Sequence, residues 1–162
     1  MIFDSAANQL NNTDFDKYIR LVFKEIVLNF NNKVGYYAKH GVDYLLIENI
    51  KNELSAPLAG LGIDSSESIT DFVRSSRQGF IQGNFDEKIM TQSKETMEKS
   101  LDKFIEEIST FTPKDRAGWG CGLGHGVLKT TPEENVRLFV KKIRKAFVWL
   151  LWSLINALIK PY

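Results

Sequence analysis

The sequence predicts an all-α fold, a single-domain bundle of about five helices that ends in a long, largely apolar helix. Apolar residues recur at three- and four-residue spacing along several stretches, which is typical of amphipathic helices. The four prolines stay out of the interior of those stretches. A chain of 162 residues with 43% hydrophobic and 25% charged residues suits one domain with a core of its own.

The first predicted helix covers residues 13–30 and carries one wide apolar face. Thr13 can cap it, and the aspartates that follow suit the positive end of the helix dipole. A second helix is predicted over residues 42–54, ending before Pro57, because proline disfavours helical geometry in the preceding residue. Residues 35–41, GYYAKHG, lie between them and are interpreted as a turn or a helix start.

Two more helices are predicted from capping signals. Residues 58–63, LAGLGI, are interpreted as a loop, after which Asp64 and Glu67 form the reciprocal capping pattern of a third helix over residues 64–80. Asn84 and Glu87 repeat that pattern. They predict a fourth helix of about 25 residues, roughly 38 Å long, which stops at Thr112 and Pro113.

The last predicted helix covers residues 132–159, with Thr131 as its cap and Pro132 in its first position. Its first half is basic and amphipathic, and its second half is apolar nearly all round. A helical segment that is apolar on all sides suits three roles: the centre of the bundle, a surface that docks on a partner or a second copy, or a membrane-surface helix. The predicted binding residues are Lys141, Lys142, Arg144, Lys145, Trp149 and Trp152. The apolar run of residues 146–159 is about 21 Å long as a helix, too short for a hydrocarbon core of about 30 Å.

Residues 118–126, GWGCGLGHG, place a glycine at every second position before that helix. They are interpreted as a flexible or tightly packed connection between two long helices. Because glycine absorbs large dihedral changes, a hinge that releases the last helix is a further hypothesis. The predicted hinge residues are Gly118, Gly120, Gly122, Gly124 and Gly126. The segment also holds the single cysteine, Cys121, and one of the two histidines, His125.

The run GWGCG resembles the nucleophile motif of the ubiquitin-like-protein cysteine peptidases, in which the cysteine follows Gly-Trp-Gly. The resemblance covers five residues of this chain and implies that Cys121 is a nucleophile. Those enzymes also supply an aspartate and a histidine after the cysteine. This chain departs from the pattern, because no aspartate follows Asp115 and its one later histidine is His125.

Other chemistry has less support in the sequence. Cys121, His125 and His40 could supply three zinc ligands at most and lack the usual paired spacing, so no metal site and no cofactor is predicted. The glycines lack the lysine and hydroxyl residue of a phosphate-binding loop. A net charge of +1 gives no field to attract nucleic acid. One cysteine and no secretory leader favour the cytoplasm, with peripheral membrane association left open.

The sequence is therefore interpreted as a non-enzymatic helical interaction protein. It would act through its basic and then aromatic C-terminal helix on a protein partner or an anionic membrane surface, and self-association stays open. The alternative is a cysteine hydrolase in which Cys121 is the nucleophile and His125 its base.

Overall fold

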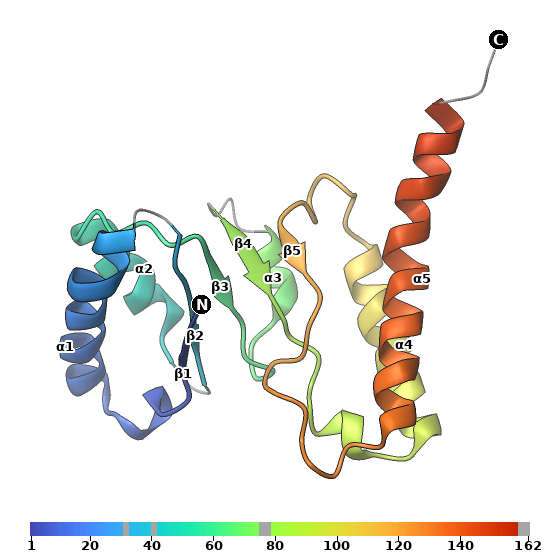
Figure 1. The fold of residues 1–162 in the computed structure, drawn as a ribbon, viewed down its shortest axis with the longest axis horizontal. Coiled ribbons are helices and arrows are strands. Elements are labelled where there is room, and N and C mark those ends of the chain that lie inside the picture. The colour runs from blue at the N-terminus through green and yellow to red at the C-terminus, as the bar shows by residue number, and fades with distance from the viewer. Residues whose placement is uncertain (31–32, 40–41, 75–78, 159–162) are drawn as a thin grey trace. The chain divides into compact units, whose positions relative to one another are not determined.

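The computed structural model describes residues 1–30, 33–39, 42–74 and 79–158, with side chains as far as Phe147 (Figure 1). The described strands are β1 (Ile2–Asp4), β2 (Gly35–Ala38), β3 (Gly60–Gly62), β4 (Phe80–Gln82) and β5 (Trp119–Gly120). The described α-helices are α1 (Asn12–Val22), α2 (Tyr44–Glu53), α3 (Ile69–Arg74), α4 (Lys94–Ser109) and α5 (Glu133–Leu158). Strands and helices alternate over most of the chain, so the protein is α/β and the predicted all-α bundle is wrong.

The described chain divides into two compact units. The first holds residues 1–86 and 113–125 and contains the whole sheet, together with α1, α2 and α3. The second holds residues 87–112 and 126–162 and contains α4 and α5.

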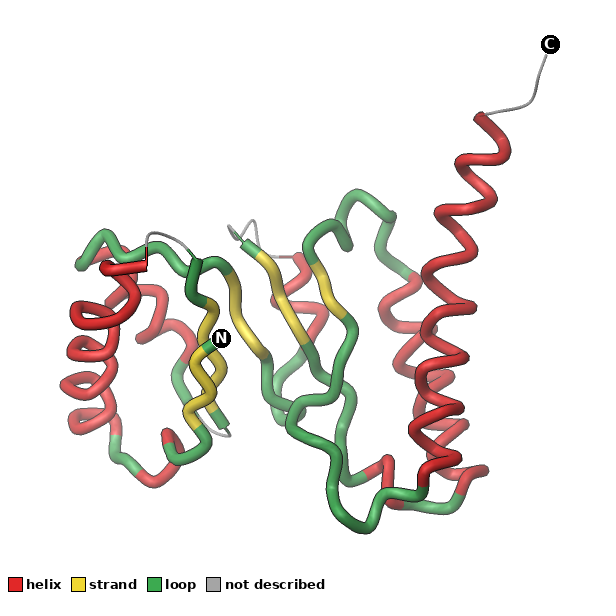
Figure 2. The backbone as a smooth tube through the Cα atoms, viewed as in Figure 1, coloured by secondary structure: helices red, strands yellow, loops and turns green. Residues whose placement is uncertain are grey.

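The sheet of the first unit has five strands in the order β1-β2-β3-β4-β5, and every neighbouring pair is parallel (Figure 2). Parallel neighbours need a crossover between them. Helices supply the first three crossovers, with α1 between β1 and β2, α2 between β2 and β3, and α3 between β3 and β4. All five strands therefore end at one edge of the sheet, which we call the carboxyl edge.

The strand register places side chains in rows across the sheet. One row joins Ile2, Tyr36, Leu61, Ile81 and Trp119. This row faces the helices, because Tyr36 is fully buried and packs edge-on against Phe23 with ring centroids 6.1 Å apart. The next row joins Phe3, Tyr37, Gly62, Gln82 and Gly120 on the opposite face. Phe3 in this second row is 68% exposed, and Gln82 and Gly120 are also exposed.

The first two helix predictions are confirmed in position. The predicted helix over residues 13–30 is α1, continued by a π-helix at Phe23–Val27 and a 3-10 turn at Leu28–Phe30. Its cap is Asn11, whose side chain accepts from the Asp14 amide, and not Thr13. The predicted helix over residues 42–54 is α2, capped by Asp43. The predicted turn or helix start is wrong for residues 35–38, which form β2.

The third and fourth helix predictions are wrong at their starts. Among the described residues α3 covers Ile69–Arg74, and Phe80 belongs to β4. The Asp64 carboxylate does not cap α3 but accepts from the amide and hydroxyl of Ser66. α4 begins at Lys94 and is capped by Ser93, after a 3-10 turn at Ile89–Thr91.

In the second unit, α4 packs on α5 and buries Met97, Leu101 and Ile108 completely. Asn135 of α5 is also buried, and its side-chain amide donates to the carbonyls of Met90 at 3.0 Å and Gln92 at 2.9 Å. α5 runs from Glu133 to Leu158, so the predicted helix over residues 132–159 is confirmed. Within the part of the chain that is described, no helix is long and apolar enough to cross a membrane.

Candidate functional site

The carboxyl edge gathers polar residues from loops that are far apart in the sequence. Lys39 follows β2, Asp64 lies two residues after β3, Asn84 two residues after β4, and His125 five residues after β5. In parallel α/β sheets, ligands bind at this edge, because each strand delivers its following loop there. We therefore take the carboxyl edge as the candidate site.

Asp64 is the most buried of these residues, with 1% of its surface exposed. One carboxylate oxygen accepts from the Ser66 amide at 2.9 Å and from the Ser66 hydroxyl at 2.8 Å. The other oxygen accepts from the Tyr37 hydroxyl at 3.4 Å. Its backbone amide donates to the Tyr44 hydroxyl, which itself donates to the Gly62 carbonyl. A buried carboxylate with several donors holds one orientation, and here it lies beside the second row of the sheet.

Two side chains fasten the loops around Asp64. The Asn84 amide donates to the carbonyl of Asp64 at 2.9 Å and to that of Glu67 at 2.7 Å, which joins the loops after β3 and β4. The Trp119 indole donates to the Gly83 carbonyl at 2.9 Å, which joins β5 to the loop after β4. Burial, followed by the nearby charge of Asp64, raises the pKa of Glu67.

His125 is positioned by the glycine segment. The Phe85 amide donates to the Gly122 carbonyl at 3.0 Å, and the Gly124 amide donates to the Phe85 carbonyl at 2.8 Å. Gly124 is buried, and a Cβ atom there would lie 2.3 Å from the Ser65 backbone nitrogen. The segment therefore lies directly against the loop that carries Asp64. The half-buried His125 ring meets the Tyr37 ring with centroids 6.4 Å apart and an interplanar angle of 61°.

The five glycines of residues 118–126 have different surroundings. Gly118 has a positive φ of 87°, and Gly120 belongs to β5. Gly122 and Gly124 carry the hydrogen bonds to Phe85, whereas a Cβ atom on Gly126 would meet nothing within 4 Å. The predicted connection between two helices thus contains a strand of the sheet. The hinge role of these glycines stays a prediction.

Cys121 has the wrong environment for the predicted nucleophile. It is half-buried, and burial raises the pKa of its thiol to about 12. A cysteine nucleophile needs the opposite shift, because the thiolate is the attacking form. Cys121 is therefore a neutral thiol at physiological pH. His40, the second histidine considered as a zinc ligand, lies outside the described residues.

We expect Cys121 to react with iodoacetamide roughly 10²-fold more slowly at pH 8 than free cysteine does, because a raised pKa leaves little thiolate. The rate should keep rising toward pH 12, where this thiol ionises, and should not level off near pH 9. Stopped alkylation followed by mass spectrometry measures the rate at each pH. The same chain in denaturant is the control and should react at the ordinary rate. A plateau below pH 9 in the folded protein would contradict the raised pKa.

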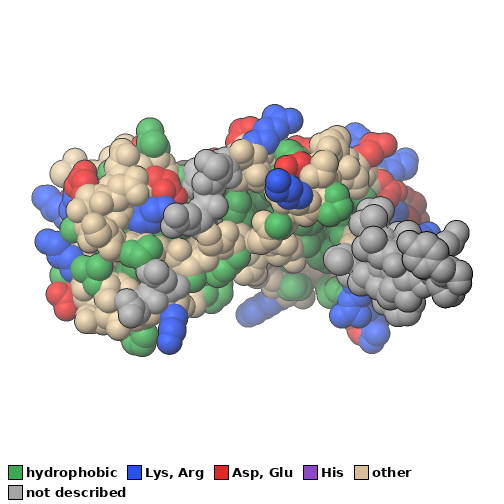
Figure 3. Space-filling model, turned by 90° about the horizontal axis from the view of Figure 1, so that it is seen from above, with side chains coloured by type: hydrophobic (Ala, Val, Ile, Leu, Met, Phe, Trp, Pro, Cys, Tyr) green, Lys and Arg blue, Asp and Glu red, His purple; other side chains and the backbone are tan. Residues whose placement is uncertain are grey.

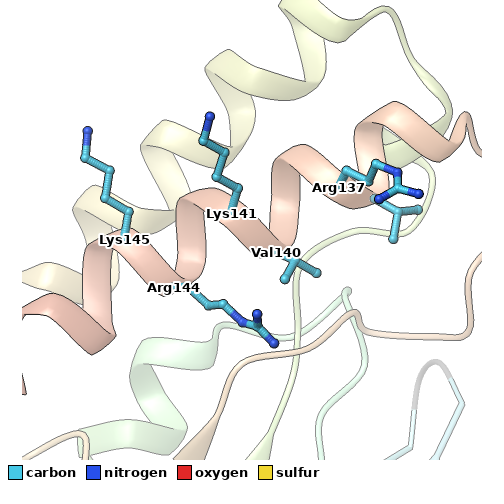
Figure 4. Close-up of a pocket in the computed structure, with 6 residues that line it drawn as sticks. Arg137, Val140, Lys141, Arg144 and Lys145 are labelled. Carbon is cyan, nitrogen blue, oxygen red and sulfur yellow. The ribbon is translucent and has the colours of Figure 1, made fainter.

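The predicted binding residues on α5 lie in the second unit. Lys141, Arg144 and Lys145 are exposed and line a hollow along the helix together with Val136, Arg137 and Val140. Figure 4 shows Lys141 and Lys145 projecting to one side of α5 and Arg144 to the other. Lys142 instead pairs with Glu98 at 2.8 Å and Asp102 at 2.6 Å on α4, so its charge is balanced. The side chains of Trp149 and Trp152 lie outside the described residues.

The face drawn in Figure 3 and the described metal-ligating residues indicate no further site. On the face drawn in Figure 3, Lys and Arg side chains are scattered among acidic and uncharged ones. Among the residues whose positions are described, no group of three or more His, Cys, Asp and Glu side chains is placed to hold a metal ion. The carboxyl edge is the strongest candidate site that remains.

Comparison with known proteins gives a consistent result. Residues 1–146 match the family described as uroporphyrinogen decarboxylase (URO-D). A uroporphyrinogen decarboxylase of Prochlorococcus marinus (strain MIT 9301) is 30% identical over 161 residues, covering 89% of this chain and 40% of that protein. One of Rickettsia akari (strain Hartford) is 27% identical over 146 residues, covering 88% of this chain and 41% of that protein. The chain therefore spans about two fifths of the length of the curated relatives that it matches.

Proposed function

Because the chain belongs to the uroporphyrinogen decarboxylase family, we propose that it binds uroporphyrinogen at the carboxyl edge and releases a carboxylate of it as CO₂. One observation supports this proposal above the others. Tyr37 of β2 comes together at this edge with Asp64 and His125 from the loops after β3 and β5, and His125 is only half-buried. A site of this kind pairs a buried, oriented acidic group with a ring that water and ligand can reach.

Family membership also corrects two predictions about function. The family is one of enzymes, so a non-enzymatic interaction or membrane protein acting through the C-terminal helix is wrong. The alternative, a cysteine hydrolase, is wrong as well, because the relatives are decarboxylases and the Cys121 thiol has a raised pKa.

A decarboxylation breaks the bond between the carboxylate carbon and its neighbour. CO₂ leaves, and the electron pair that stays on the neighbouring carbon must take up one proton. We assign that proton to the His125 imidazole, because imidazole is an effective general acid near neutral pH. The half-buried position of His125 lets water return the proton after each turnover.

Lys39 is the residue to which we assign the binding of a substrate carboxylate. It is half-buried, directly follows β2, and lies on the same side as Tyr37 if strand alternation continues for one residue. A charge-assisted hydrogen bond from an ammonium to a carboxylate is roughly twice as strong as a neutral one. Lys39 would therefore select carboxylated ligands at this edge.

The test is an anaerobic assay of the full chain with uroporphyrinogen, with products resolved by mass spectrometry and binding followed by Trp fluorescence. We expect products that lack CO₂, and binding roughly 10- to 100-fold weaker in Lys39→Ala, as the loss of a charged hydrogen bond predicts. Lys33→Ala is the matched control, because Lys33 is exposed and precedes β2 at the opposite edge. A wild-type chain that neither binds nor decarboxylates uroporphyrinogen would overturn the proposal, as would equal losses in the two variants.

A further inference from the structure

We infer that Tyr37 is a positioning residue for this site, which holds Asp64 with its hydroxyl and orients His125 with its ring. The inference rests on the proposed function of the carboxyl edge. It adds that the two groups on separate loops are placed by one side chain of a central strand, and that this placement determines the rate of proton delivery.

The Tyr37 side chain packs closely against the glycine beside it. A Cβ atom on Gly62 would be 2.9 Å from the Tyr37 Cβ and 3.0 Å from its Cδ2. Gly62, the register partner of Tyr37 on β3, thus leaves the space into which the Tyr37 side chain packs. From there the hydroxyl reaches the Asp64 carboxylate, two residues beyond Gly62, at 3.4 Å. The sheet, and not a loop, sets the position of this tyrosine.

The same ring has aromatic neighbours on β1 and after β5. Its centroid lies 6.1 Å from that of Phe3 and 6.4 Å from that of His125. Tilted and edge-on contacts at these separations favour particular ring orientations. Because Tyr37 is 7% exposed, its own ring has little freedom, so it restricts the His125 ring that it meets.

Tyr36, the residue before Tyr37, is a tyrosine on the opposite face of the sheet, which the helices cover. Its hydroxyl donates to the Asp4 carboxylate at 2.8 Å, and its ring packs on Phe23 of the helix layer. Both tyrosines therefore pair with a buried carboxyl group near the end of a strand. Only Tyr37 has a ring contact with His125 among the aromatic contacts of the described residues.

The experiment compares Tyr37→Phe, Tyr37→Leu and Tyr36→Phe in the full chain. Steady-state kinetics with uroporphyrinogen gives kcat and KM, and NMR gives the His125 imidazole signals, assigned by their loss in His125→Gln. We expect Tyr37→Phe to keep the imidazole shifts and to lower kcat roughly 2- to 10-fold, the worth of one long hydrogen bond. Tyr37→Leu should also move the imidazole signals, because the ring current is gone, and lower kcat further. KM should stay within twofold in both, since Tyr37 is not proposed to touch the substrate.

Tyr36→Phe should leave the imidazole signals and kcat near wild type even if the protein unfolds more easily. Imidazole signals that stay in place in Tyr37→Leu would overturn the inference, whatever the turnover. Equal losses of kcat in Tyr36→Phe and Tyr37→Phe would also overturn it, because a merely structural role predicts that result. If wild-type chain shows no turnover, the proposed function fails, while the NMR comparison still decides whether Tyr37 orients His125.

Discussion

Replacing His125 by glutamine should lower kcat for the proposed decarboxylation of uroporphyrinogen by roughly 10²- to 10⁴-fold, which is the usual contribution of a positioned general acid. Glutamine has a similar size and can donate a hydrogen bond, but it cannot deliver a proton to carbon. The half-buried ring has no counterpart elsewhere in the described chain, because the second histidine, His40, lies outside it. Product formation in single-turnover conditions measures the loss directly.

Cys121→Ala is the control for this prediction. Cys121 lies in the same glycine segment and is a neutral thiol, so we expect its removal to change kcat less than threefold, roughly the effect of a small packing change. Thermal unfolding of both variants shows whether they are folded. Full activity in a folded His125→Gln would contradict the assignment of the proton to His125. Loss of activity in Cys121→Ala alone would indicate that the Cys121 thiol takes part in the reaction.

Three of the described α-helices were predictable in position from the sequence. α1, α2 and α5 carry apolar residues at helical spacing and clear start or stop signals, so their positions were confirmed. The errors at α3 and α4 have one cause. Asp64 and Asn84 were interpreted as helix caps because a short polar residue before an acidic one suits a cap. In the structure both side chains fasten loops at the carboxyl edge.

The strands could not be recognised by periodicity because each has two to four residues. β2 is buried at all four positions, so it shows no alternation of apolar and polar residues. β3 is Gly-Leu-Gly, and glycine is depleted in strands. The sheet needs those glycines for close packing: a Cβ on Gly60 would lie 2.3 Å from the Phe80 carbonyl oxygen. The glycines that allow close packing of the sheet are therefore also the reason why β3 is not recognised from the sequence.

Part of the candidate site could be predicted from the sequence. The glycine segment indicated His125 and Cys121 as candidate catalytic residues. The structure supports His125, because its ring lies at the carboxyl edge, whereas the pKa of the Cys121 thiol is raised. Lys39 and Tyr37 were missed, since their importance follows from strand register and not from neighbours in the sequence. One signal was available: Lys39 and Asp64 each follow a short apolar run that precedes a helix. That repeated arrangement is typical of strand ends in α/β proteins.

A large effect on stability is expected from Gly124→Ala. The added methyl group would lie 2.3 Å from the Ser65 backbone nitrogen and 2.6 Å from its Cβ, so two loops must move apart. We expect a loss of about 1–3 kcal/mol in the free energy of unfolding, as for other overpacked sites, measured by urea denaturation. The proposed decarboxylase activity should fall as well, because the next residue is His125.

Gly126→Ala is the matched control, one residue beyond His125 on the other side. A methyl group there meets nothing within 4 Å, so the substitution should be neutral or raise the unfolding free energy by about 0.4–1 kcal/mol through the unfolded chain. Neither glycine has a positive φ, so a difference between the variants measures the contact with Ser65. Equal unfolding midpoints would mean that the glycine segment does not pack on the Asp64 loop. His125 would then lack the support on which its proposed chemistry depends, because a freely moving imidazole could not hold the geometry that proton transfer requires.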